Sequence, residues 1–157
     1  MRRFGNPPEP ERKYRLRPGA YAILVRGGDM LVTHQMEPRP EFQLPGGGVD
    51  PGEHPVQALH REVLEETGYT ITRPRRLGAF RRFNYMPEYD LWAEKLCTIY
   101  LAQPARRLGP PREAAHTAVW MPADTAARVI AVSGDRHFVR QTFGLPENSI
   151  RTPLRSS

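Results

Sequence analysis

The chain has 157 residues, a length that suits one domain with a sizeable hydrophobic core. Hydrophobic residues make up 39% and charged residues 25%, as in ordinary globular proteins, and no apolar stretch is long enough to cross a membrane. The basic N-terminus lacks the apolar segment of a secretory signal, and the single cysteine, Cys97, excludes an internal disulfide. We therefore expect a cytoplasmic protein with a buried, inert thiol at Cys97.

The formal net charge is +6, with arginines concentrated in residues 1–18 and again in residues 73–82. A basic surface attracts polyphosphates and nucleic acids, although scattered arginines can also serve only to keep a protein in solution. Residues 1–18 are predicted to form a flexible, basic, Pro-rich arm. Residues 19–145 are predicted to form a single domain, and residues 146–157 a polar C-terminal tail.

Apolar runs bounded by turn residues predict six strands, and apolar residues at helical spacing predict three helices. The strands are expected at 20–26, 30–36, 41–44, 77–85, 92–102 and 118–121. The helices are expected at about 55–67, 122–132 and 135–143. The glycine run at 46–48 and residues 103–112 are expected to be loops. A mixed β-sheet with helices on its faces, an α/β fold, is the natural assembly.

The helix predicted over residues 55–67 has an apolar stripe and, about a quarter turn away, an acidic one. The apolar side chains are Val56, Leu59 and Val63, and the acidic ones are Glu62, Glu65 and Glu66. Repulsion among the glutamates and the helix dipole each cost up to about 1 kcal/mol near a helix C-terminus. A bound Mg²⁺ or Mn²⁺ would compensate, because both prefer carboxylate oxygens. The stripe thus indicates metal-assisted phosphate chemistry, and the alternative is a solvated acidic face.

The residues around this helix match a longer motif. Gly47 is followed after five residues by Glu53, and after seven more by Arg61-Glu62-Val63-Leu64-Glu65-Glu66-Thr67-Gly68-Tyr69. This pattern resembles the Nudix box, G-x5-E-x7-R-E-U-x-E-E-x-G-U, and only Tyr69 is slightly off pattern. With so many fixed positions the match is specific, although it covers only residues 47–69. The chain is therefore similar to the Nudix (MutT-like) hydrolase family, which implies a Nudix-type α/β/α sandwich with a mixed β-sheet.

The resemblance also implies roles for the residues of the box. Metal binding is expected at Glu62, Glu65, Glu66 and Gly47. Glu53 and Arg61 are expected to form a structural pair that braces the loop against the helix. Gly68 is expected to end the helix in a left-handed conformation.

Outside the box, Nudix hydrolases often complete the site with an acidic residue several positions before a late tryptophan. Trp120 supplies that tryptophan here, and Glu113 is the best-placed carboxylate, with a merely solvated loop residue as the alternative. His116 is also near, as a structural histidine or an acid–base group. The candidates for the catalytic base are Glu66, Glu62 and Glu113, and the choice among them stays open.

Substrate recognition is expected in the loops around Arg39, residues 85–89 and residues 106–112. Arg39, Tyr85 and Tyr89 are the candidate substrate-binding side chains, because aromatic rings can stack on a nucleobase. The alternative for Tyr85 is a place in the core. Tyr85 and Pro87 favour different substrates by resemblance, dinucleoside polyphosphates and ADP-ribose respectively, so they do not decide between them.

The resemblance implies a Mg²⁺-dependent pyrophosphohydrolase, with Mn²⁺ as a substitute metal. Its substrate would be a nucleoside diphosphate linked to another group: an NTP, a dinucleoside polyphosphate, ADP-ribose or a nucleotide sugar. The alternative is a non-catalytic Nudix module that binds a nucleotide or RNA as a sensor, against which the intact carboxylates argue. Binding of an RNA 5′ end and homodimerisation stay open, and no membrane partner is expected.

Overall fold

A mixed sheet of seven strands runs through the computed structural model, which describes residues 1–147. The strands are β1 (Arg15–Arg26), β2 (Asp29–Gln35), β3 (Glu41–Gln43), β4 (Gly46–Gly48), β5 (Tyr69–Met86), β6 (Leu91–Arg107) and β7 (His116–Pro122). Their main order is β3-β2-β1-β6-β5, with β4 paired to β1 and β7 to β2. The pairing of β1 with β6 is parallel, and the other pairings are antiparallel.

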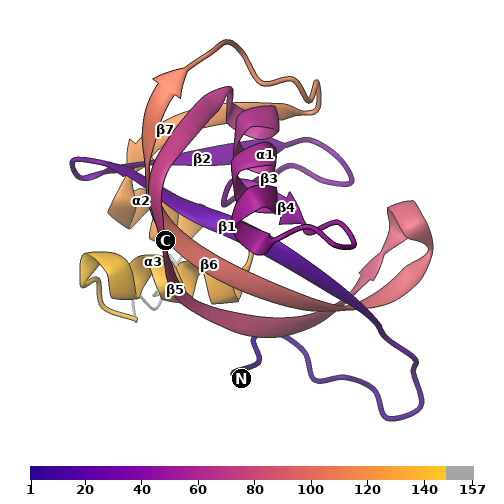
Figure 1. The fold of residues 1–157 in the computed structure, drawn as a ribbon. Helices are drawn as coiled ribbons and strands as arrows, with labels where there is room; N and C mark the ends of the chain where they lie inside the picture. Colours follow the sequence, from indigo (N-terminus) through magenta and orange to yellow (C-terminus); the bar gives the residue numbers. More distant parts are fainter. Residues whose placement is uncertain (148–157) are drawn as a thin grey trace, which may run out of the picture.

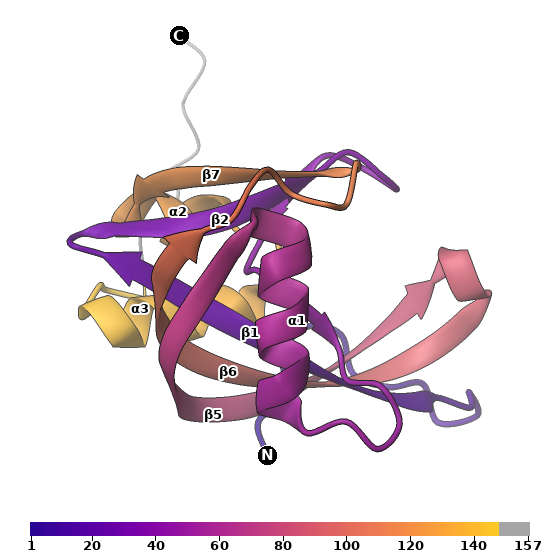
Figure 2. The ribbon, with the colours of Figure 1, turned by 45° about the horizontal axis from the view of Figure 1, so that its top comes forward.

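Helices cover both faces of this sheet (Figure 1). They are α1 (Pro55–Thr67), α2 (Ala123–Val129) and α3 (Ser133–Phe143), and a 3₁₀ helix, η1 (Pro87–Tyr89), links β5 to β6. Helix α1 lies on one face, and α2 and α3 lie on the other, as the two views show (Figure 2). The predicted α/β/α sandwich with a mixed sheet is confirmed.

Alternating side chains along β1 separate two hydrophobic cores. On the α1 side, Ala20 and Leu24 pack with Leu59 and Val63 of the helix, as the predicted apolar stripe requires. Ile23 points to the opposite face and joins the cluster beneath α2 and α3. Fully burying one such aliphatic side chain contributes about 1.5–3 kcal/mol, so packing on α1 fixes the acidic stripe relative to the sheet.

The predicted arm ends too late, because β1 begins at Arg15 and residues 15–18 pair with β6. Residues 15–18 contain proline and arginines, which break the apolar pattern by which a strand is recognised in a sequence. Pro18 is tolerated because its carbonyl still accepts a hydrogen bond from the Val49 N–H. Further upstream, the Phe4 N–H donates to the carbonyl of Arg81, and the Phe4 ring packs edge-on against Phe80.

The predicted loops at 46–48 and 103–112 were partly wrong. Residues 46–48 form β4, which pairs with residues 19–21 of β1, and β6 continues to Arg107. Its partner β5 begins at Tyr69, well before the predicted residue 77. Register shifts in residues 70–78 interrupt the pairing with β6. These irregularities break the alternation of side chains that identifies a strand in a sequence.

Cys97 is buried and unpaired, as predicted, and burial raises the pKa of its thiol to about 12. Within residues 1–147 no helix has the length and apolar character needed to cross a bilayer. Most of the predicted C-terminal tail, residues 148–157, lies outside the described part of the chain.

Candidate active site

Helix α1 begins and ends where the sequence predicts. At its start, Nδ1 of His54 accepts a hydrogen bond from the Val56 N–H at 3.1 Å. At its end, Gly68 adopts a left-handed conformation with φ of 78° and donates its N–H to the carbonyl of Leu64. These caps satisfy backbone groups that a helix terminus otherwise leaves unpaired. They fix where the acidic stripe ends.

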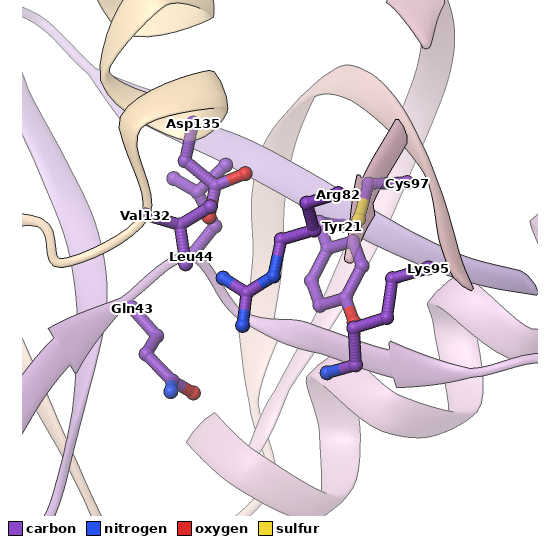
Figure 3. Close-up of a pocket in the computed structure, with 8 residues that line it drawn as sticks. All are labelled: Tyr21, Gln43, Leu44, Arg82, Lys95, Cys97, Val132 and Asp135. Atoms are coloured by element: carbon purple, nitrogen blue, oxygen red, sulfur yellow. The ribbon is translucent and has the colours of Figure 1, made fainter. Parts of the chain in front are cut away.

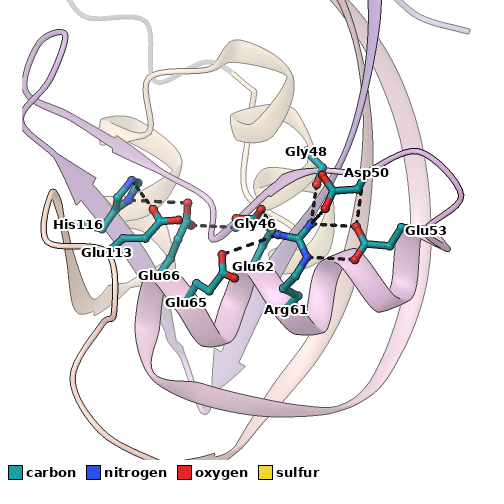
Figure 4. A network of polar contacts seen from close by, with 10 residues as sticks. All are labelled: Gly46, Gly48, Asp50, Glu53, Arg61, Glu62, Glu65, Glu66, Glu113 and His116. Carbon is teal, nitrogen blue, oxygen red and sulfur yellow. Dashed lines mark hydrogen bonds and ion pairs between the residues drawn. The ribbon is translucent and has the colours of Figure 1, made fainter. Parts of the chain in front are cut away.

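Arg61 is the centre of a polar network on α1 (Figure 4). Its guanidinium makes two hydrogen bonds to Glu53, at 3.0 and 2.8 Å, and a third to the carbonyl of Gly48 at 3.1 Å. The two bonds lower the pKa of Glu53 to about 2. The same guanidinium lies 2.7 Å from Glu62 and 3.7 Å from Glu65. Arg61 therefore braces the loop and also offsets part of the acidic charge, which the sequence did not predict.

Glu66 is the most deeply placed carboxylate of the stripe, with 7% of its surface exposed. Its Oε2 accepts a hydrogen bond of 3.0 Å from the Gly46 N–H, so strand β4 holds it in place. Burial raises the pKa of Glu66 well above its ordinary value, and the Gly46 hydrogen bond opposes that shift. Burial also raises the pKa of Glu62, whereas Glu65 is the more exposed neighbour.

The loop before β7 docks onto the C-terminal end of α1. The N–H groups of Arg112 and Glu113 both donate to the carbonyl of Glu65, at 2.8 and 3.3 Å, and the Leu108 N–H donates to Gly68. These bonds satisfy carbonyls that the helix end leaves free. They also bring Glu113 to the acidic stripe, so this residue, distant in sequence, lies beside the box.

Two overlapping groups of ligating atoms result. One oxygen each of Glu62, Glu65 and Glu113 lie within 4.8 Å of one another, and so do one ligating atom each of Glu66, Glu113 and His116. His116 Nε2 lies 3.2 Å from Glu113, while its Nδ1 is buried without a hydrogen-bond partner. Clustered carboxylates and an unpartnered nitrogen suit a divalent cation, so these residues fit the metal that the sequence predicts.

A cleft of about 1120 Å³ extends from this cluster, and the three predicted substrate-binding residues Arg39, Tyr85 and Tyr89 all line it. Residues 106–112, the third predicted recognition segment, do not line this cleft. Tyr85 is 40% exposed and hydrogen-bonds Asp90 through its hydroxyl, which excludes a place in the core.

Besides the predicted Arg39, three cationic residues line the cleft that the sequence analysis did not assign to the site: Arg17, Arg82 and Lys95. Arg17 lies in the predicted arm, while Arg82 and Lys95 lie within predicted strands. The N-terminal extension of β1 was the missing information, because it places Arg17 beside η1, with its guanidinium 4.7 Å from the centre of the Tyr89 ring.

A smaller pocket adjoins the cleft and is also lined by Arg82 and Lys95 (Figure 3). On its far side lies Asp135, in the first turn of α3 and 5% exposed. Burial raises the pKa of Asp135 to about 7, although the nearby charges of Arg82 and Lys95 oppose that shift. An aspartate near a helix N-terminus is favourable at the surface, so no pattern in the sequence indicates its burial.

The raised pKa of Asp135 predicts a pH effect on stability. The folded state keeps this proton up to about pH 7, whereas the unfolded chain loses it near the ordinary aspartate pKa of 3.8. The contribution is therefore fully present below about pH 4 and is lost as the pH rises through 7. From pH 5 to pH 8, the free energy of unfolding of wild type minus that of Asp135→Asn should fall by roughly 2–3 kcal/mol.

Urea unfolding at several pH values measures this difference. Asp124→Asn, which removes an exposed aspartate from the first turn of α2, is the matched control and should give a flat difference. Parallel pH profiles for wild type and Asp135→Asn would show that Asp135 is ionised throughout.

The sandwich is shared with solved structures of MutT proteins. A MutT NUDIX hydrolase from Burkholderia pseudomallei superposes with a TM-score of 0.68 at 23% identity, covering 81% of this chain and 98% of that one. A MutT protein from Bacillus halodurans gives 0.65 at 21% identity, covering 79% and 80%. At this level of identity the likeness concerns the fold.

Membership of a family is shown by a match that covers most of the chain. The family model of the NUDIX domain matches residues 15–142, so this chain belongs to the NUDIX family. The match begins where β1 begins and ends within α3, and it includes every residue of the acidic cluster.

Three curated relatives match parts of the chain. A Bacillus subtilis (strain 168) protein, provisionally named 8-oxo-dGTP diphosphatase, is 35% identical over 47% of this chain and 50% of its own length. A CMP-5′-(N-acetyl-N-hydroxy-3-aminopropyl)phosphonate hydrolase of Streptomyces rubellomurinus (strain ATCC 31215) is 38% identical over 57% and 41%. An RNA pyrophosphohydrolase of Helicobacter pylori (strain ATCC 700392 / 26695) is 37% identical over 36% and 39%. The matches thus span half or less of each relative.

Proposed function

We propose that this chain is a Mg²⁺-dependent hydrolase that cleaves a phosphoanhydride bond in a nucleoside diphosphate derivative. The observation that carries the proposal is the convergence of Glu62, Glu65, Glu66 and Glu113, three of which line a cleft that also contains cationic side chains. Carboxylates that hold a cation at one end and cations further along suit a polyphosphate chain. The names of relatives that act on 8-oxo-dGTP and on RNA support this substrate class.

The glutamates of α1 would hold the metal, with Gly47 beside them. A Cβ atom built on Gly47 would lie 2.6 Å from Oε2 of Glu62, so only glycine leaves that carboxylate its place. When bound, a divalent ion there neutralises phosphate charge and lowers the pKa of an attacking water. Glu113 is the best-placed base, because its side chain is 41% exposed and lines the cleft.

The rest of the cleft would bind the nucleotide. Arg39 and Arg17 are placed to attract phosphates, and Tyr85 and Tyr89 present aromatic rings on which a base could stack. The pocket lined by Asp135 offers hydrogen-bonding groups for the polar edge of a base. Sequence and geometry thus both support a nucleotide substrate.

Metal binding predicts a gain in stability. Mg²⁺ or Mn²⁺ at 100 times its dissociation constant should raise the free energy of unfolding by about 2.7 kcal/mol, because the ion binds the folded state. Differential scanning calorimetry should then show a melting temperature higher by roughly 5–10 °C. Glu62→Gln should reduce the gain, whereas Glu11→Gln, at an exposed residue upstream of β1, should preserve it. An unchanged melting temperature, with substrate also present, would contradict the metal site.

A hydrolysis screen that detects the nucleoside monophosphate product tests the function. The panel contains NTPs including 8-oxo-dGTP, dinucleoside polyphosphates, nucleotide sugars, ADP-ribose and 5′-triphosphate RNA, each with Mg²⁺ and with Mn²⁺. We expect turnover of at least one nucleoside diphosphate derivative and none with EDTA. Tight binding across the panel without turnover would instead favour the sensor module.

A further inference from the structure

His116 begins β7 and faces the acidic cluster, but the function proposed above gives it no role. Its ring is held from two sides. Nε2 lies 3.2 Å from Glu113 Oε2, within hydrogen-bonding distance, and Nδ1 lies 3.8 Å from Glu66 Oε1. The latter separation is too long for a hydrogen bond, and Nδ1 is buried without any hydrogen-bond partner.

The two contacts favour one tautomer of the imidazole. A neutral imidazole has one N–H and one lone pair, and a carboxylate oxygen only accepts, so the form with the proton on Nε2, 3.2 Å from Glu113 Oε2, suits this arrangement. The lone pair of Nδ1 then faces Oε1 of Glu66. That oxygen is itself free to act as a ligand, because the Gly46 N–H binds the other oxygen of the carboxylate, Oε2.

Two electron-rich atoms that face each other in a buried site suit a cation between them. Metal–ligand bonds of about 2.1 Å span about 3.0 Å at a right angle and about 4.2 Å in line. The 3.8 Å between His116 Nδ1 and Glu66 Oε1 falls within this range. Histidines that bind metals commonly have a carboxylate beside the second ring nitrogen, and Glu113 Oε2 lies 3.2 Å from His116 Nε2.

We propose that His116 Nδ1 is a nitrogen ligand to a divalent ion that it shares with Glu66. This inference rests on the proposed metal-dependent function and adds a mixed nitrogen–oxygen position to an otherwise carboxylate site. Mn²⁺, like Mg²⁺, binds carboxylate oxygen, but as a first-row transition ion it also accepts imidazole nitrogen, which Mg²⁺ does less readily. The position therefore selects an ion such as Mn²⁺ over Mg²⁺, and Glu113 orients the imidazole that binds it.

Pulsed electron paramagnetic resonance of Mn²⁺ tests this proposal on the full chain, because ¹⁴N modulation of the echo reports directly coordinated imidazole. Wild type should show the modulation, and His116→Gln should lose it. His60→Gln, at an exposed histidine of α1, is the matched control and should keep it. Titrations should show that His116→Gln lowers Mn²⁺ affinity at least about tenfold, while Mg²⁺ affinity changes less than about threefold.

The wild-type spectrum alone can overturn the inference, so the test does not depend on how well His116→Gln folds. Bound Mn²⁺ without ¹⁴N modulation would remove His116 as a ligand but leave metal-dependent hydrolysis intact. Modulation that persists in His116→Gln would assign the nitrogen to another residue. A chain that binds no Mn²⁺, even with nucleotide present, would overturn both this inference and the proposed function.

Discussion

Replacing Glu66 by Gln should lower turnover by a hundredfold or more, on the order of 3 kcal/mol of activation free energy. Gln keeps the size of the side chain, and its carbonyl oxygen can still accept the Gly46 N–H that now bonds Oε2. The change removes only the negative charge, which the proposed metal requires. Because burial already disfavours that charge, the free energy of unfolding without metal should stay the same or rise.

Single-turnover rates with saturating nucleotide and metal separate chemistry from binding in this variant. Glu11→Gln is the matched control, because Glu11 is exposed upstream of β1 and does not line the cleft. It should retain activity within about threefold of wild type. A wild-type rate in Glu66→Gln would remove Glu66 from the mechanism.

Three consecutive glycines allow a second comparison, with alanine at each position in turn. Gly46→Ala should be the most destabilising, by about 3 kcal/mol. Gly46 has φ of 147°, which disfavours a side chain, and a Cβ there would lie 2.2 Å from the carbonyl oxygen of Ala20. Both the backbone of β4 and its hydrogen bond to Glu66 would have to shift. Gly48→Ala has open space around its Cβ and should be neutral.

Alanine at the middle position, Gly47, should lower activity with little change in stability. A Cβ on Gly47 would meet the end of the Glu62 side chain, which can move, so the free energy of unfolding should change by less than about 1 kcal/mol while turnover falls at least tenfold. Urea unfolding and steady-state kinetics on the three variants measure both quantities. Equal effects on stability at Gly46 and Gly48 would contradict the close approach of β4 to β1.

The sequence predicted the box helix with accuracy, because the signals there are local. Pro55 at the first turn, the apolar spacing of Leu59 and Val63, and Gly68 after the last turn each act within a few residues. The same locality explains the misses. The pairing of residues 15–18 with β6 and of β4 with β1 depends on partners far away in sequence, which no local pattern contains.

The site was predictable to the same extent. Glu62, Glu65 and Glu66 follow from the motif, and the late tryptophan pointed to Glu113, which the structure does bring to the cluster. The sequence suggests only a structural or acid–base role for His116. Its Nδ1 comes near Glu66 only because β7 lies beside the end of α1 in the folded chain. Asp135 was missed for a related reason: its burial depends on α3 packing over the strands that carry Arg82 and Lys95.

Hydrolysis in ¹⁸O-labelled water tests the central claim most directly. Wild type would be incubated with Mg²⁺ and the panel nucleotide that turns over fastest, and the products would be analysed by mass spectrometry. The account predicts a nucleoside monophosphate and a phosphorylated second product, one of which carries a single ¹⁸O on phosphorus. EDTA should stop the reaction and added Mg²⁺ should restore it. A nucleotide that stays bound but intact with both Mg²⁺ and Mn²⁺, or products without the label, would contradict it.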